Sequence, residues 1–238
     1  KMWLDGTPDD PTPALLFGSA FHCAMLEPDR FATEYAIQPD FGDCRYKEAK
    51  AERDRWRAAN DGRTPLDAAD GDAIAGMIAS IRKHPKAGPL LANGTPEITM
   101  LWTDQETGLR CKGRADFFAP QFRTVLDVKT TEDARPPAFA KSVFAYGYDR
   151  QAAFYTNGFE AVGAPIDLFV FVAVEKVAPY LVKVHALDGE ALALGEASIR
   201  RDLLAMRSCI ESLDFAGYDP DINIISMAPW MTAARLAS

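Results

Sequence analysis

The sequence lacks a long apolar run, a cysteine cluster and a signal segment. No stretch reaches the roughly 18 uncharged residues of a membrane-spanning helix, so we expect no membrane partner. The first residues, from Lys1 to Gly6, turn polar at once, which is unlike a signal peptide. The few cysteines contain no C-x-x-C pair, which argues against zinc, an iron–sulfur cluster and a disulfide framework. We therefore expect a reducing, cytoplasmic location. The cysteines are Cys23, Cys44, Cys111 and Cys209.

Positive charge is also in short supply, because 26 basic residues face 34 acidic ones and the formal net charge is −8. A protein that coats DNA non-specifically is normally basic, so the composition speaks against that class. An enzyme that cuts nucleic acid is still compatible with it, since metal-binding carboxylates add negative charge and DNA can follow a local basic strip. The charged segment from Arg45 to Arg57 is either such a strip or a solvated helix.

The 238 residues, 48% of them hydrophobic, suit one large domain. Thr12-Pro13 and Thr64-Pro65 are typical of a helix start, with a capping threonine before a proline at the first helical position. Hydrophobic spacing predicts helices at 13–26, 65–84, 136–145, 147–163 and from 188 onward. It predicts strands at 97–103, 109–118, 123–130, 166–175 and 179–186. We expect a single α/β domain over 1–238, with a helical and loop insertion at 29–96 and an irregular tail at 219–238.

Two carboxylates and a lysine lie at the ends of two neighbouring predicted strands. Asp127 and Lys129 are two residues apart in a strand, so both side chains point to one face of the sheet. Asp116 ends the preceding strand, and a short turn lets the two strands lie side by side. This combination suits a divalent metal beside a phosphodiester. A plain ion pair between Asp127 and Lys129 at a strand edge is an equally good interpretation of those two residues alone.

Five more polar residues are candidates only in the company of this group. Gln151 and Tyr155 are four apart and share one helix face, although each alone reads as an ordinary surface or core residue. His22 lies on the apolar face of the first helix, where a hydrogen-bonded core histidine is the commoner case. Glu97 opens the first strand and is either a further ligand or a polar strand start. Arg114 stands two residues before Asp116, which makes it a candidate phosphate contact.

These motifs together resemble the RecB-type branch of the PD-(D/E)XK nuclease superfamily. They are Gly113-Arg-Ala-Asp116, Asp127-Val-Lys129 and Gln151-Ala-Ala-Phe-Tyr155, with the upstream helical His22. Within that branch, the amino-acid sequences of residues 17–28 and 109–116 are most similar to the exodeoxyribonuclease VIII (RecE-type) nuclease domain. The resemblance covers about residues 13–186. It implies a restriction-endonuclease-like core, with a central mixed β-sheet flanked by helices.

The resemblance also implies roles for the site residues. Asp116 and Asp127 would bind Mg²⁺ or Mn²⁺ through oxygen. Lys129 would contact the attacking water and the scissile phosphate. The remaining candidates would complete the metal site or line it for DNA. These are His22, Glu97 and the carbonyl of Val128 for the metal, and Arg114, Gln151 and Tyr155 for DNA.

The function that the resemblance implies is a Mg²⁺-dependent deoxyribonuclease. We expect a 5′-to-3′ exonuclease on linear duplex DNA that leaves 3′ single-stranded tails for a recombinase or annealing protein, as in phage DNA recombination and repair. Processive relatives form rings around DNA, so a homotetramer is expected as well. Two alternatives stay open at this point. One is an endonuclease or repair-associated enzyme of the same fold, and the other is a catalytically idle DNA-binding module.

Overall fold

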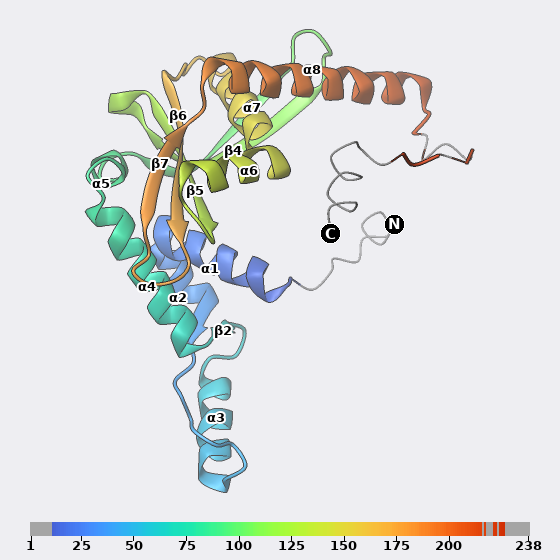
Figure 1. Ribbon diagram of the computed structural model, residues 1–238. Helices are drawn as coiled ribbons and strands as arrows, with labels where there is room; N and C mark the ends of the chain where they lie inside the picture. Colours follow the sequence, from blue (N-terminus) through green and yellow to red (C-terminus); the bar gives the residue numbers. More distant parts are fainter. Residues whose placement is uncertain (1–10, 216, 218–220, 223, 227–238) are drawn as a thin grey trace, which may run out of the picture.

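The computed structural model describes residues 11–215, 217, 221, 222 and 224–226, so most of the predicted tail lies outside the described residues. Its centre is a five-stranded sheet with the strand order β3-β4-β5-β6-β7 (Figure 1). Neighbouring strands are antiparallel except β5 and β6, which are parallel, so the sheet is mixed and the expected α/β class is confirmed. The strands are β3 Thr95–Thr103, β4 Arg110–Ala119, β5 Thr124–Thr131, β6 Leu168–Glu175 and β7 Val182–Ala186.

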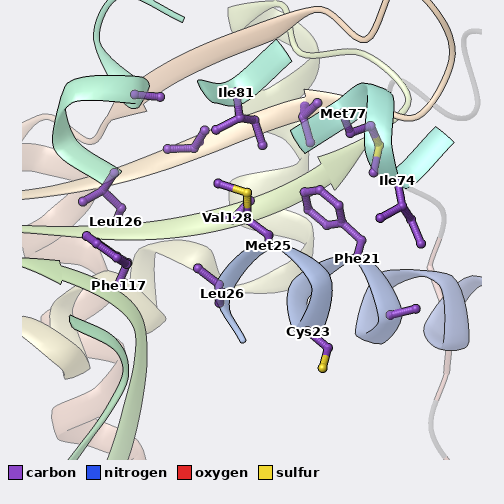
Figure 2. Close-up of a cluster of buried hydrophobic side chains, with 14 of the residues drawn as sticks. Phe21, Cys23, Met25, Leu26, Ile74, Met77, Ile81, Phe117, Leu126 and Val128 are labelled. Carbon is purple, nitrogen blue, oxygen red and sulfur yellow. The ribbon is translucent and has the colours of Figure 1, made fainter. Parts of the chain in front are cut away.

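Helices cover both faces of this sheet (Figure 1). Because strand side chains alternate, β5 sends Leu126 and Val128 into one core and Val125 into the other. The first core is closed by α1 and α4 and contains the fully buried Phe21 and Met77 (Figure 2). The second core is closed by α6 and α7. The four helices are α1 Pro13–Leu26, α4 Ala68–Lys83, α6 Pro136–Tyr146 and α7 Tyr148–Ala161.

Capping residues explain where the helices begin. One helix start was predicted at the wrong residue. Thr12 Oγ1 accepts a hydrogen bond from Leu15 N at 3.3 Å, so α1 begins as expected. Thr64-Pro65, in contrast, does not start a helix but belongs to strand β2 (Thr64–Leu66), which pairs in parallel with β1 (Tyr35–Ile37). A two-stranded sheet consists only of edges, so the missing N–H of a proline is tolerated there. The helix begins at Ala68, where Asp67 accepts from Asp70 N.

The segment between β1 and β2 carries α3 (Lys47–Ala59), which lies away from the central sheet (Figure 1). This helix has no buried residue, and the rings of Phe41 and Trp56 meet edge to face at 6.2 Å beside it. The charged segment is therefore helical, whereas its use as a track for DNA phosphates stays a prediction. Two short helices were not predicted, because a helix of seven or fewer residues shows too little hydrophobic periodicity to be recognised. They are α2 Pro28–Glu34 and α5 Ala87–Leu91.

Arginines of helix α8 (Gly189–Ser212) bind the turn of the β3–β4 hairpin, and Asp104 is the most buried carboxylate there. Asp104 accepts from Thr107 Oγ1 at 2.6 Å and from Arg200 Nη1 at 2.9 Å. Partial burial alone would raise its pKa, but these hydrogen bonds and the Arg200 charge outweigh it and lower the pKa to about 2. Within the described residues no helix, α8 included, is long and apolar enough to span a membrane.

We expect Asp104→Ala to lower the free energy of unfolding at pH 7 by about 2 kcal/mol, because it removes a charge-assisted network. The pKa is depressed in the folded protein, so the loss is fully present above about pH 4 and disappears as the pH falls toward 2. Urea denaturation at several pH values measures this. Asp202→Ala, which removes an exposed carboxylate on α8, is the control and should change little. Equal effects of the two substitutions would contradict the assignment.

Candidate active site

Strands β4 and β5 separate where the two candidate carboxylates lie. Their pairing runs from Ala119 opposite Thr124 to Phe117 opposite Leu126, and then ends. Beyond that point β4 pairs with β3 alone and β5 with β6. At the separation, the Val128 N–H donates to Asp116 Oδ2 at 2.8 Å, so a side-chain carboxylate takes the place of a backbone acceptor. Asp116 and Asp127 therefore stand at a fork between two strands.

The alternation of side chains along β4 reverses at Asp116. Ala115 packs into the core beneath α6 and α7, whereas Phe117 packs into the core beneath α1 and α4. Asp116 is the residue at which the direction changes, which frees its side chain from both cores. Glu97 lies opposite it, between the paired positions on either side, and has a left-handed backbone with φ 53°. Such a conformation is costly for a non-glycine residue, and strain of this kind gathers at functional sites.

Asp127 is 1% exposed and is held by two neighbours. Its Oδ2 accepts from Gln151 Nε2 at 2.6 Å, and its Oδ1 forms an ion pair with Lys129 Nζ. Lys129 Nζ also lies 4.7 Å from the centre of the Tyr148 ring, a cation–π contact. The lysine is thus fixed between a carboxylate and an aromatic face, with its ammonium directed at the fork.

Tyr155 supports this arrangement from the next turn of α7. Its phenol interacts with the Gln151 side chain and with the backbone of Arg114. Burial, followed by the charge of Asp127, raises the pKa of Tyr155, which keeps the phenol neutral. Gly113 makes room for the ring, because a Cβ there would lie 3.2 Å from it, and so a side chain on Gly113 would press the helix away from β4.

Burial strongly affects the charges at the fork. Desolvation raises the pKa of Asp116 to about 6 and that of Asp127 to about 7, and the charge of Asp116 adds to the second shift. Lys129 opposes both shifts. Its own burial disfavours the ammonium, but Asp127 and Asp116 together raise the net pKa of Lys129 above its usual value. Two buried carboxylates with one lysine leave a site that gains from an additional cation.

A pocket of about 480 Å³ opens from the fork toward α1. His22 lines it, with Nδ1 3.5 Å from Asp116 Oδ2, and burial lowers the pKa of this imidazole, so that it is neutral at neutral pH. Glu97 and Arg114 line it as well, and Arg114 Nε lies 2.7 Å from Glu97 Oε2. Arg114 is 59% exposed and stands at the mouth. The pocket therefore combines oxygen and imidazole donors with an exposed guanidinium.

The donor set suits a hard divalent cation. Two buried carboxylate oxygens, Glu97 Oε2 and Asp127 Oδ1, receive no hydrogen bond, although each has a cation near it. Carboxylate oxygens are what Mg²⁺ and Mn²⁺ prefer. In the part of the chain that the structure describes, however, no three such side chains stand close enough to form a ready-made metal site. Metal binding would have to draw the carboxylates together and release Lys129 and Arg114 from them.

The structure brings all the candidate residues of the sequence to this one place, although their roles remain predictions. Val128 joins them through its N–H, which holds Asp116, and through a hydrogen bond to His22. Sequence reasoning missed Tyr148. The signal was present, because Tyr148, Gln151 and Tyr155 follow i, i+3, i+7 spacing along α7 and so share one face.

Comparisons with known structures find a similar fold. The crystal structure of a "putative exonuclease" from Eubacterium rectale matches with a TM-score of 0.56 at 15% identity, over 93% of this chain and 81% of that one. At such low identity the likeness concerns the fold alone. The crystal structure of SSO0001 reaches a TM-score of only 0.32 at 14% identity, over 80% of this chain and 84% of that one, which is too low to support a common fold.

A search of curated protein sequences finds no match. The family described as "PDDEXK-like domain of unknown function (DUF3799)" matches residues 2–218, which include every candidate site residue. This agrees with the broad resemblance to PD-(D/E)XK proteins, while the narrower one to exodeoxyribonuclease VIII stays a prediction. With a fork of carboxylates, a fixed lysine and a match over nearly its whole length, the chain belongs to the PDDEXK-like family DUF3799.

Proposed function

We propose that this protein is a metal-dependent exonuclease that degrades linear duplex DNA from the 5′ end. The main support is the fork itself, where the partly buried Asp116 and the buried Asp127 lie beside the fixed ammonium of Lys129. Family membership and a fold similar to that of a "putative exonuclease" support the same reaction class. The product would be a 3′ single-stranded tail for an annealing or recombinase protein. By resemblance, the active form is a homotetrameric ring.

Each residue has a task in this proposal. Asp116 and Asp127 would hold Mg²⁺ or Mn²⁺, and Glu97, His22 and the Val128 carbonyl are the other candidate ligands. The bound ion would lower the pKa of a water molecule and neutralise phosphate charge. Lys129 orients the attacking water and stabilises the charge that develops on the phosphate.

Residues around these ligands set their orientation. Gln151 donates to Asp127 Oδ2 and so leaves Oδ1 directed at the fork. Tyr155 holds Gln151 in turn. Arg114, at the mouth of the pocket, is placed for a contact with the DNA backbone.

Digestion of end-labelled DNA tests the direction and the mode of cutting. With Mg²⁺ we expect linear duplex to release a 5′ label early and a 3′ label late, while covalently closed circles stay intact. Nicking of closed circles would show an endonuclease instead. Early release of the 3′ label would reverse the proposed polarity.

DNA binding should depend on the metal as strongly as cutting does. Without metal, Lys129 and Arg114 offset only two of the three negative charges of Glu97, Asp116 and Asp127, whereas two divalent cations would add +4 and make the fork positive. We expect duplex DNA to bind at least about 10-fold more tightly in Ca²⁺ than in EDTA at equal ionic strength, measured by fluorescence anisotropy. Equal affinity under the two conditions would contradict the proposed mode of binding.

A further inference from the structure

A row of aromatic rings leads from the lysine of the fork to the protein surface. Lys129 Nζ lies over the Tyr148 ring, and the Tyr146 ring follows with a centroid distance of 5.7 Å and an angle of 31°. Tyr148 is fixed from behind by Phe171 at 5.6 Å and Phe139 at 6.1 Å. Tyr146 ends the row and is 72% exposed. A large, rigidly backed aromatic side chain is thus offered to solvent beside the candidate catalytic lysine.

The backbone between the two tyrosines is built for this placement. Tyr146 is the last residue of α6 and Tyr148 the first of α7, and Gly147 between them has a left-handed backbone with φ 69°. Glycine adopts this conformation without strain, so one helix can end and the next begin at a sharp corner. In one continuous helix, residues 146 and 148 would not face each other. The break at Gly147 therefore allows the two rings to come together.

A second pocket of about 330 Å³ adjoins the row. Phe139, Tyr146 and Tyr148 form its aromatic side, and Thr131 and Ser142 contribute hydroxyl groups. Lys176 also lines the pocket, where it pairs with Glu132, and Asp133 is the second acidic residue there. Thr130 lines both this pocket and the one that contains His22, Glu97 and Asp116. The two pockets therefore meet at β5 beside Lys129, and a strand whose phosphate lies at the fork would place its neighbouring nucleotide here.

We propose that Tyr146 stacks an unpaired nucleobase of the DNA strand that is cut at the fork. This inference rests on the proposed function and adds a nucleotide subsite to it. An exposed aromatic face next to hydroxyl groups matches a base with its sugar, and base–aromatic stacking tolerates any sequence. Bases inside a duplex have both faces covered by their neighbours, so the base on Tyr146 must have left the stack. The enzyme would therefore hold the terminal nucleotide in an opened form.

Fluorescence of 2-aminopurine tests this without cleavage. The probe is a duplex with one unpaired 2-aminopurine at a mismatched 5′ end, bound in Ca²⁺, because this base is bright only while it is unstacked. Stacking on a tyrosine quenches this base. We expect quenching with the wild type and with Tyr146→Phe, which keeps the ring, and bright fluorescence with Tyr146→Ala. Tyr46→Ala is the matched control, because Tyr46 is similarly exposed at 68% but lies next to α3, and it should behave as wild type.

Kinetics with Mg²⁺ supply the second readout. Tyr146→Ala should raise KM about 10-fold with little change in kcat, and an abasic site at the stacked position should cost the wild type the same factor. The two changes should not add, because each removes the same contact. Identical 2-aminopurine signals for wild type and Tyr146→Ala, or fully additive losses, would overturn the inference. Absence of any degradation by the wild type would instead refute the proposed function, and the Ca²⁺ binding result would still decide the role of Tyr146.

Discussion

Lys129→Met should reduce Mg²⁺-dependent hydrolysis of linear duplex DNA by about 10³-fold or more while the protein remains folded. The ammonium is the cation that the fold itself supplies at the fork, and it is directed there by Asp127 and Tyr148. Removing one preorganised group that stabilises developing charge typically costs 10²- to 10³-fold, and a charged group with a role in orienting water stands at the upper end of that range. Methionine keeps most of the side-chain volume, so packing against Tyr148 is retained.

Lys183→Met is the matched control. Lys183 is an exposed strand lysine on β7, two strands away from Lys129, and its loss should leave the rate within about 2-fold of wild type. Circular dichroism and thermal unfolding establish that both variants are folded. A Lys129→Met enzyme that retains near wild-type activity would reduce the Asp127–Lys129 contact to a structural ion pair, the alternative that the sequence alone left open.

The parts of the fold that follow from local rules could be predicted from the sequence. The helix after Thr12-Pro13 begins at a capping side chain followed by a proline at the first helical position, and both signals are local. The antiparallel pair of strands around Asp104 to Gly108 is equally local. The period of two in a strand placed Asp127 and Lys129 on one face, and their ion pair agrees with that reasoning.

The shape of the site could not be predicted, because it depends on departures from those same rules. Strict alternation along β4 would direct Asp116 into one of the cores, and only the reversal between Ala115 and Phe117 frees it. The left-handed backbone of Glu97 is unexpected for a glutamate and has no sequence signal. The error at Thr64-Pro65 has a similar origin, because pairing with the distant strand β1 makes this segment a strand although its local sequence favours a helix start.

The metal-free protein should lose stability as the pH rises from about 4 to about 7. Folding raises the pKa of Asp127 to about 7 and that of Asp116 to about 6, so between those values and the unfolded pKa the folded state binds more protons. The free energy of unfolding then falls with increasing pH. A rise in the pKa of Asp127 from 3.8 to about 7 corresponds to on the order of 4 kcal/mol. Urea denaturation in EDTA at pH 4 to 8 measures this loss.

Asp127→Asn should flatten this dependence, because the amide cannot ionise. Asp167→Asn is the control, since it removes an exposed carboxylate paired with Arg123 and should keep the wild-type slope. Mg²⁺ should restore wild-type stability most at pH 7 to 8, where the carboxylates are ionised, and least near pH 5. A pH profile that is the same for wild type and Asp127→Asn would show that burial does not raise the pKa of Asp127 in the folded protein.

The most direct measurement is a crystal structure of the protein soaked with Mn²⁺, with anomalous scattering used to locate the ion. We predict an anomalous peak at the fork, bound by oxygens of both Asp116 and Asp127, that is absent from crystals of Asp127→Asn. Mn²⁺ bound only elsewhere on the protein, or no peak at saturating concentration, would contradict the assignment of these two carboxylates as the metal site.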